Sequence, residues 1–227
     1  MKSYGQFCPV AKASEVVAER WTPLVLRELF SGSVRFNDLR RGVPLISPTL
    51  LSRRLKELEQ AGVVECSRGP DRRSSEYRLT EAGLELWPVI EALGVWGKRW
   101  TQARIEQRDL DAGVLMWGLR GSLRCERLPR RRTVLKFELA GTSSGKRLWW
   151  LVAEHGEVEL CLLDPGFEVD LHVRTHIRTL TAVVLGDLGC DQVVRSGDVA
   201  LEGAPGLVRA FSGLFVPSPL AKIERRV

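Results

Sequence analysis

Residues 36–80 read FNDLRRGVPLISPTLLSRRLKELEQAGVVECSRGPDRRSSEYRLT, and this stretch decides the fold of the first half of the chain. Its pattern predicts a short helix over 36–41, a bend over 42–46 and a second helix that begins after Ser47. Ser47 is a favourable N-cap, and Pro48 suits the first helical position, where its missing N–H costs nothing. Two helices joined by a tight bend are typical of a helix-turn-helix.

The second helix has two chemically distinct faces. Leu51, Leu55 and Leu58 recur at a spacing that forms one apolar stripe, which should face the core. The opposite side and its flanks carry hydroxyl and cationic groups, which read base edges and contact phosphates. The candidate DNA contacts here are Ser47, Thr49, Ser52, Arg53, Arg54 and Lys56. The alternative is the solvated face of an ordinary helix.

A basic hairpin is expected directly after this helix. Residues 63–67 and 76–79 have the composition of short strands, and a turn-rich segment joins them. Such a wing beside a recognition helix can reach phosphates or the minor groove. Its candidate contacts are Arg68, Arg72 and Arg73, and exposed loop charge is the alternative for each.

The positive charge of the chain is unevenly placed. The 227 residues carry a net charge of +6. Residues 35–78 hold 10 Lys and Arg against 6 Asp and Glu, while residues 1–110 hold 18 against 14, so both segments have a net charge of +4. The whole excess of the first half therefore lies in the segment expected to face DNA, as counterion release requires.

The first hundred residues resemble the HxlR family of bacterial transcription regulators, relatives of the MarR type. The matching pieces keep the order and spacing of that family. They are Cys8-Pro9-Val10, Arg20-Trp21-Thr22, Leu26-Arg27-Glu28-Leu29, Arg35-Phe36-Asn37-Asp38-Leu39, Ile46-Ser47, Leu51, Leu55-Lys56-Glu57-Leu58 and Glu76-Tyr77-Arg78-Leu79-Thr80. The resemblance implies a sequence-specific regulator of double-stranded DNA. The wing tip Asp71-Arg72-Arg73 departs from the Pro-rich wing common in HxlR proteins and is closer to the MarR style.

A homodimer is expected, because the segment after Thr80 is more apolar than a small domain can bury alone. Pro88 should kink the helix that Thr80 opens. Two copies would present two recognition helices to a palindromic operator. The candidate interface residues are Val16, Val17, Trp21, Trp87, Ile90, Leu93, Trp96 and Trp100. The alternative is packing within one chain or against a second domain.

The second half of the chain predicts an α+β domain with a mainly antiparallel sheet covered by helices. Alternating segments over 133–139, 147–152, 158–163 and 168–173 indicate a meander of strands. Two helices and one more strand are expected to follow. The predicted domains are therefore 1–108, for DNA binding and dimerisation, and 109–227.

The last hundred residues resemble sterol-carrier-protein-like domains, chiefly in residues 164–171 and 196–203. The resemblance implies an apolar tunnel for a lipid-like effector. Its candidate lining is Trp150, Leu160, Leu162, Leu171, Val173, Leu180, Val184, Phe211 and Phe215. An ordinary core without a cavity is the alternative, and the domain would then serve dimerisation alone.

The five cysteines, at positions 8, 66, 125, 161 and 190, indicate neither a disulfide framework nor a zinc site. No apolar run is long enough for a transmembrane helix or a signal peptide, so we expect a cytoplasmic protein with no membrane partner. Some HxlR-type regulators sense oxidants through a cysteine near the N-terminus, which makes Cys8 a candidate redox sensor. Its thiol precedes a helix, and Lys12 is one turn away. A small residue at a dimer seam is the alternative.

Catalysis is not expected. The three histidines, at positions 155, 172 and 176, lack the spacing of a nucleophile triad or a metal site, and phosphate-binding glycine loops are absent from the sequence. We therefore expect no enzyme, no metal and no cofactor. Two hypotheses remain. One is a dimeric regulator that responds to an apolar effector or through Cys8, and the other is a lipid-binding module whose helical half only dimerises.

Overall fold

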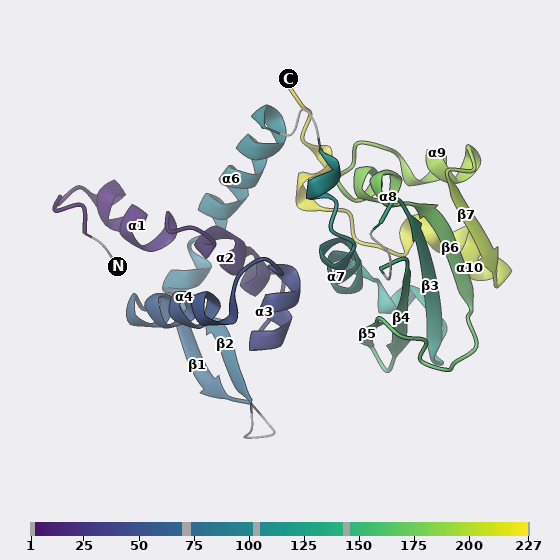
Figure 1. Cartoon of the computed structure of the whole chain (residues 1–227), viewed down its shortest axis with the longest axis horizontal. Helices are drawn as coiled ribbons and strands as arrows, with labels where there is room; N and C mark the ends of the chain where they lie inside the picture. Colours follow the sequence, from purple (N-terminus) through teal and green to yellow (C-terminus); the bar gives the residue numbers. More distant parts are fainter. Residues whose placement is uncertain (1–2, 70–73, 102–104, 143–145, 227) are drawn as a thin grey trace. The chain divides into compact units, whose positions relative to one another are not determined.

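The computed structural model describes residues 3–69, 74–101, 105–142 and 146–226 (Figure 1). The chain divides into two compact units, Met1–Val95 and Trp96–Val227. This division falls inside one helix, whereas the sequence predicts functional domains of 1–108 and 109–227, and those ranges stay a prediction. In the described part of the chain, no helix is both long and apolar enough to cross a bilayer.

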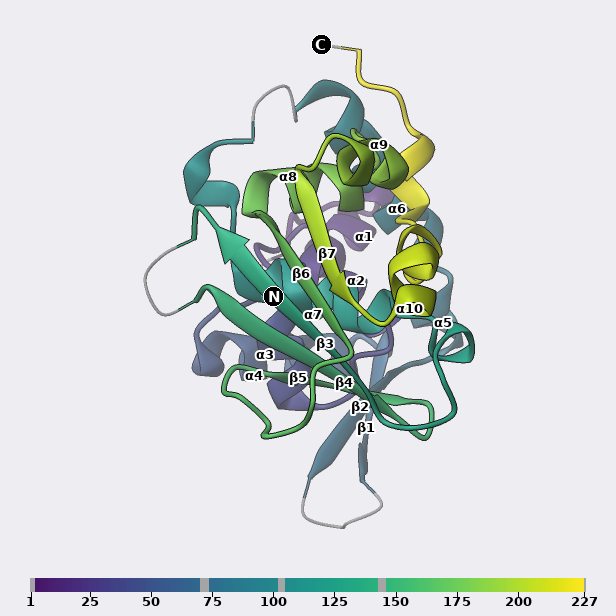
Figure 2. The same cartoon turned by 90° about the vertical axis from the view of Figure 1, so that its right-hand side faces the viewer.

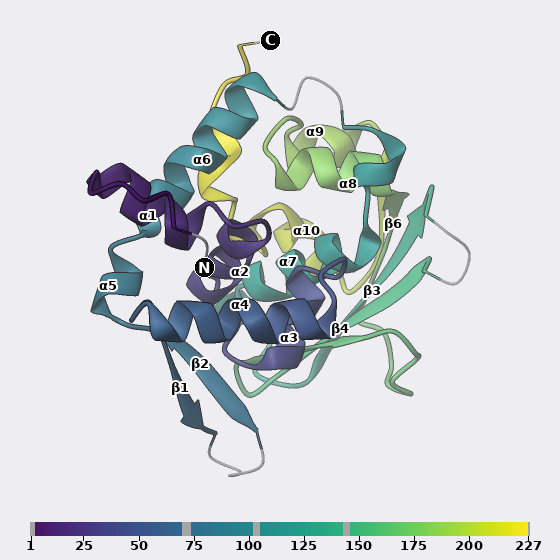
Figure 3. The ribbon, with the colours of Figure 1, turned by 60° about the vertical axis from the view of Figure 1, so that its left-hand side comes forward.

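The first unit is a winged helix-turn-helix (Figure 3). Its elements are α1 (Pro9–Val17), α2 (Thr22–Phe30), α3 (Phe36–Gly42), α4 (Pro48–Gln60), β1 (Val64–Arg68), β2 (Ser75–Leu79), α5 (Glu81–Leu84) and α6 (Trp87–Trp100), the last of which continues into the second unit. The two strands pair antiparallel and place Cys66 opposite Tyr77. A core of leucines, isoleucines and valines from α2, α3, α4, β1 and α6 holds these elements together.

The bend between α3 and α4 depends on a close approach of two helices. Arg27 on α2 donates to the backbone carbonyl of Gly42 at 3.0 Å. The carboxyl group of Glu28 lies where a side chain at Gly42 would be, since a Cβ there would lie 2.0 Å from its Cδ. Ser33 also donates its hydroxyl to Glu28 at 3.3 Å. Glycine at this position therefore lets α3 end against α2.

The predicted kink at Pro88 is wrong. The segment after Thr80 forms the short helix α5, which ends at Leu84, and α6 then begins afresh at Trp87. Pro88 is the second residue of α6, within the first turn, where backbone N–H groups have no partner inside the helix. The ring therefore starts a helix here and does not bend one.

The second unit is a five-stranded sheet with helices on one face (Figure 2). Its strands are β3 (Thr133–Ala140), β4 (Leu148–Glu154), β5 (Glu157–Cys161), β6 (Leu171–His176) and β7 (Val199–Gly203). Its helices are η1 (Gln107–Asp109), α7 (Ala112–Ser122), η2 (Cys125–Arg127), α8 (Ile177–Val184), α9 (Cys190–Arg195), α10 (Pro205–Ala210), η3 (Phe211–Gly213) and η4 (Pro219–Lys222). The predicted α+β class with a mainly antiparallel, helix-covered sheet is confirmed.

The strand order is β5-β4-β3-β6-β7, so β6 does not extend the meander that the sequence predicts. After the edge strand β5 the chain crosses to the far side of β3, and β6 pairs with β3 in parallel. Alternation along a strand reports which face is buried and says nothing of its neighbour, which is why the sequence pattern missed this pairing. One sheet face packs on α7, α8, α9 and α10, and the other carries a smaller apolar cluster around Trp150.

Candidate nucleic-acid interface

Helix α4 buries its apolar face in the core of the first unit and presents a polar face to solvent. Leu51, Leu55 and Leu58 are buried in the core of the first unit, as their spacing predicts. Ser47 caps the helix, and its hydroxyl accepts the backbone N–H of Leu50 at 3.2 Å. Four of the other candidate contacts lie together on the exposed side of the helix. They are Thr49, Ser52, Arg53 and Lys56.

Arg54 does not belong to this exposed face, which corrects the expectation that it contacts DNA. Its side chain is 6% exposed and forms ion pairs with Glu19 at 2.7 Å and Glu57 at 2.5 Å. Its Nε also donates to the carbonyl of Arg20 at 3.2 Å. A guanidinium that satisfies two carboxylates and a carbonyl inside the unit has no free edge for a base. Arg54 therefore anchors α4 to the segment between α1 and α2.

Arg53 remains accessible, with 63% of its side chain exposed. Its Nε lies 3.8 Å from Glu57, one turn along α4. An exposed pair of this kind contributes little, so a phosphate can compete for the guanidinium. The helix thus offers a cation at its middle and hydroxyls near its N-terminus, which is the end that a recognition helix directs at base edges.

The hairpin β1–β2 and the N-cap position of α3 carry cations that the sequence pattern does not single out. Arg68 is exposed at the end of β1, as expected of a wing residue. Arg35 and Arg78 are also half-exposed, and both contact the buried carboxylate of Glu76, at 3.9 Å and 2.7 Å. Arg78 follows Glu76 by two residues in the same strand, and alternation along a strand places such side chains on one face. No local sequence pattern links Arg35 to Glu76 or to Arg78. Arg72 and Arg73 lie outside the described residues.

The candidate interface residues fall into two groups. Ile90 is 8% exposed and belongs to the core of its own unit, so it is no longer a candidate contact. Val16, Val17 and Trp21 pack against that same core. Trp87 is partly exposed and makes an edge-on contact with Phe30, with 5.1 Å between ring centroids.

The remaining candidates share one exposed face of α6. Leu93, Trp96 and Trp100 are 51%, 60% and 47% exposed, and Val89, which is not among the predicted interface residues, is 44% exposed. Their spacing of four, three and four residues places them in one helical stripe. Phe7, near the start of the chain, is 99% exposed. An apolar stripe of this size on a regular helix is unusual unless a partner covers it.

Most of the expected effector-lining residues pack in the core of the second unit. Leu171, Val173, Leu180 and Phe211 are buried there, and Leu160, Val184 and Phe215 pack against them. Trp150 lies on the other face of the sheet with Val134 and Val152. Leu162 is 62% exposed in the loop after β5. These nine side chains therefore do not converge on one space.

Cys8 precedes α1 and is half-buried. The ammonium group of Lys12, one turn on, lies 3.2 Å from both carboxylate oxygens of Glu15. Its charge is therefore directed at a carboxylate rather than at the thiol. All five cysteines are free thiols. A redox role for Cys8 stays a prediction.

The histidines and acidic groups of the described ranges do not form a metal-ligand cluster. Within 3–69, 74–101, 105–142 and 146–226, no three His, Cys, Asp or Glu residues group as metal ligands would. His172 lies in β6, while His176 caps α8 through its Nδ1, which accepts the backbone N–H of Arg178 at 3.2 Å. Burial lowers the pKa of His172, with Lys136 and Arg174 adding to the effect.

A capped helix with an exposed hydroxyl and cationic face, set behind a shorter helix and before a basic hairpin, defines the winged helix-turn-helix class of regulators. The sequence model of the HxlR-like helix-turn-helix family matches residues 16–105. The chain is 36% identical over 97 residues to YvaP of Bacillus subtilis, an HTH-type transcriptional regulator, in a match that covers 42% of this chain and 90% of YvaP. The chain belongs to the HxlR-like helix-turn-helix family.

Other relatives match the same region. An HTH-type transcriptional regulator of Mycobacterium tuberculosis is 47% identical over 91 residues, which cover 39% of this chain and 56% of that protein. The chain thus spans little more than half of the length of this relative. The reduced form of the regulator YodB from B. subtilis is 30% identical, with 44% of this chain and all of that chain covered, at a TM-score of 0.38. The relatives described are transcriptional regulators.

Proposed function

We propose that this chain is a homodimeric transcription regulator that binds a palindromic operator in double-stranded DNA through α4. The observation that carries the proposal is the division of α4 into a buried leucine stripe and an exposed face with Thr49, Ser52, Arg53 and Lys56. Hydroxyl, guanidinium and ammonium groups are the kind that contact base edges and phosphates when a recognition helix enters the major groove. Arg35, Arg68 and Arg78 would contact phosphates beside it. Such a role belongs in the cytoplasm, with the chromosome.

The exposed apolar stripe of α6 supports the homodimer in this proposal. Its stripe of Val89, Leu93, Trp96 and Trp100 would pack on the same stripe of a second copy, as a two-fold interface requires. Two recognition helices would then read half-sites about 34 Å apart.

The sterol-carrier-like assignment of residues 109–227 is likewise proposed, and the helix-covered sheet of the second unit is compatible with it.

In vitro selection from a random duplex library tests the function. The full chain should enrich a palindromic sequence, and Arg53→Ala and Lys56→Ala should weaken binding to that sequence. Arg209→Ala is the matched control, because Arg209 is an exposed cation on α10 in the second unit. Enrichment of no sequence, or equal binding by Arg53→Ala and wild type, would contradict the assignment of α4. Enrichment of no sequence is the result expected of the alternative, a lipid-binding module whose helical half only dimerises.

A further inference from the structure

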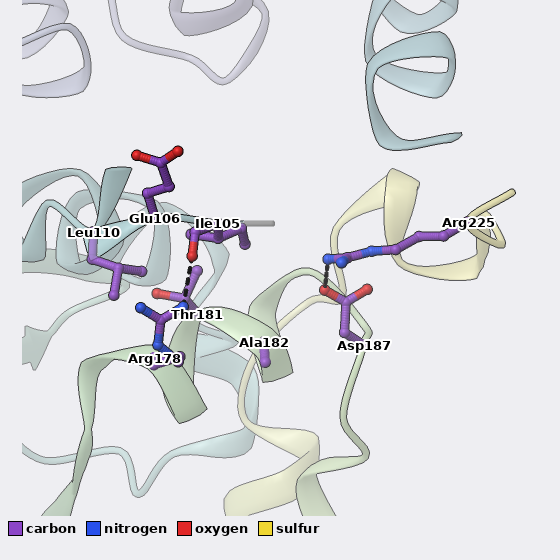
Figure 4. Close-up of a pocket in the computed structure, with 8 residues that line it drawn as sticks. All are labelled: Ile105, Glu106, Leu110, Arg178, Thr181, Ala182, Asp187 and Arg225. Carbon is purple, nitrogen blue, oxygen red and sulfur yellow. Dashed lines mark hydrogen bonds and ion pairs between the residues drawn. The ribbon is translucent and has the colours of Figure 1, made fainter. Parts of the chain in front are cut away.

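A surface cavity of about 540 Å³ lies in the second unit, at a place that none of the expected effector-lining residues reaches. It is bordered by α8, by the segment before α7 and by the C-terminal segment after η4 (Figure 4). One part of its wall is apolar and consists of Ile105, Leu110 and Ala182. Its volume is in the range of sites for small organic molecules, about 300–1,000 Å³.

Two arginines reach this cavity from different elements. Arg178 on α8 donates to the backbone carbonyl of Ile105 at 2.6 Å, and in the described part of the chain it forms no ion pair. Its positive charge is therefore not neutralised by this partner, which is an uncharged carbonyl. Arg225, from the C-terminal segment, pairs with Asp187 (Figure 4). The Nε of Arg225 is buried and has no hydrogen-bond partner among the described residues.

The charges around the cavity do not cancel. Asp187 also lies 3.6 Å from the ammonium group of Lys98, whose side chain is 3% exposed. One carboxylate thus serves two cations, and the second carboxylate at the rim, Glu106, is paired with Arg108 at 3.0 Å. The site retains positive charge beside an apolar wall. The Arg178 guanidinium, which donates to a neutral carbonyl, favours a ligand that brings a carboxylate.

We propose that this cavity binds a small organic anion with an apolar body, a monocarboxylate in its simplest form. The carboxylate accepts from the Arg178 guanidinium, because a guanidinium fork matches carboxylate geometry, and Arg225 adds positive charge at the same cavity. The apolar body lies against Ile105, Leu110 and Ala182. That this ligand is the effector of a DNA-binding regulator rests on the proposed function, whereas its binding to the cavity does not.

Calorimetric titration of the full chain with decanoate, phenylbutyrate and the neutral analogue decanol tests the site. At least one carboxylate should bind saturably, and decanol should bind about fivefold more weakly or worse, because a charge-assisted hydrogen bond is roughly twice as strong as a neutral one of about 1 kcal/mol. Arg178→Gln should weaken carboxylate binding by a similar factor and leave the decanol signal unchanged. Arg209→Gln, the matched control outside the cavity, should bind as wild type does.

Three results would overturn the site. These are saturable binding of neither carboxylate, equal binding of decanoate and decanol, or undiminished carboxylate binding by a folded Arg178→Gln variant. Arg225→Gln is a second variant, with thermal unfolding as its folding check, because Arg225 also pairs with Asp187. Operator binding by the same samples separates the two proposals. Loss of carboxylate binding with intact DNA binding removes only the cavity, and the reverse removes only the regulator function.

Discussion

Arg54 on the recognition helix α4 forms an ion pair with Glu19, with 2.7 Å between Nη2 and Oε2. The guanidinium is buried, although the residue sits in a run of polar and cationic side chains. Of the two neighbouring arginines of α4, Arg53 faces solvent and Arg54 holds the helix to the segment between α1 and α2. We therefore propose separable roles, with Arg53 acting in DNA binding and Arg54 in stability.

Replacement of Arg54 by Met should destabilise the protein. Glu57 and the carbonyl of Arg20 would lose a donor, and loss of one member of a buried ion pair costs about 3–5 kcal/mol. Since Glu19 is 36% exposed and can regain water, we expect about 2–4 kcal/mol in urea unfolding. Arg53→Met, the matched control, should stay within about 0.5 kcal/mol. Equal stability of the two variants would show that Arg54 is not an anchor.

Two glycine-to-alanine substitutions should have opposite effects on stability. A Cβ at Gly42 meets the Glu28 carboxyl group at 2.0 Å, so Gly42→Ala forces that buried group to move, at a cost of about 1–3 kcal/mol. Gly118, inside α7, has nothing within 4 Å of an added Cβ. Gly118→Ala should therefore stabilise its own unit by about 0.5–1 kcal/mol. Thermal unfolding followed by calorimetry checks both signs, and a neutral Gly42→Ala would contradict the packing of Glu28.

Charge on the apolar stripe of α6 should dissociate the proposed dimer. Leu93→Asp and Trp96→Glu each place a carboxylate in the centre of the interface, where its desolvation has no compensating partner. Both side chains are half-exposed in the single chain, so the variants should remain folded. Light scattering should report a dimer for wild type and a monomer for the variants. Leu163→Asp, on an 82% exposed loop residue, is the control that should remain dimeric. A wild-type monomer would end the dimer proposal.

His172 should make the second unit less stable in mild acid. Burial lowers its pKa below the ordinary value of 6.5, Lys136 and Arg174 lower it further, and Glu138 and Glu202 oppose them in part. The folded state then binds the proton more weakly than the unfolded state does. This contribution is complete above about pH 6.5 and is lost as the pH falls through the lower, folded-state pKa. His172→Gln should flatten the decline in unfolding midpoint over that window, and an unchanged slope would contradict the assignment.

The sequence predicted the parts of the fold that local chemistry determines. The Ser47 cap, the leucine stripe of α4 and the buried alternation of β3 all follow from neighbours in the chain. It did not predict the burial of Arg54, because the partner Glu19 lies 35 positions earlier. The parallel pairing of β6 with β3 was missed for the same reason. The cavity lined by Arg178 and Arg225 is likewise formed by segments far apart in the sequence, so no local pattern predicts it.

The salt dependence of operator binding tests the central claim most directly. The logarithm of the binding constant should fall linearly with the logarithm of salt concentration for wild type, because phosphate contacts release counterions. Lys56→Ala should reduce that slope by about one for each phosphate contact removed, while Arg209→Ala should leave it unchanged. Two results would contradict DNA binding through α4. One is a wild-type affinity that does not depend on salt, and the other is a salt slope that is the same for the wild type as for both Lys56→Ala and Arg53→Ala.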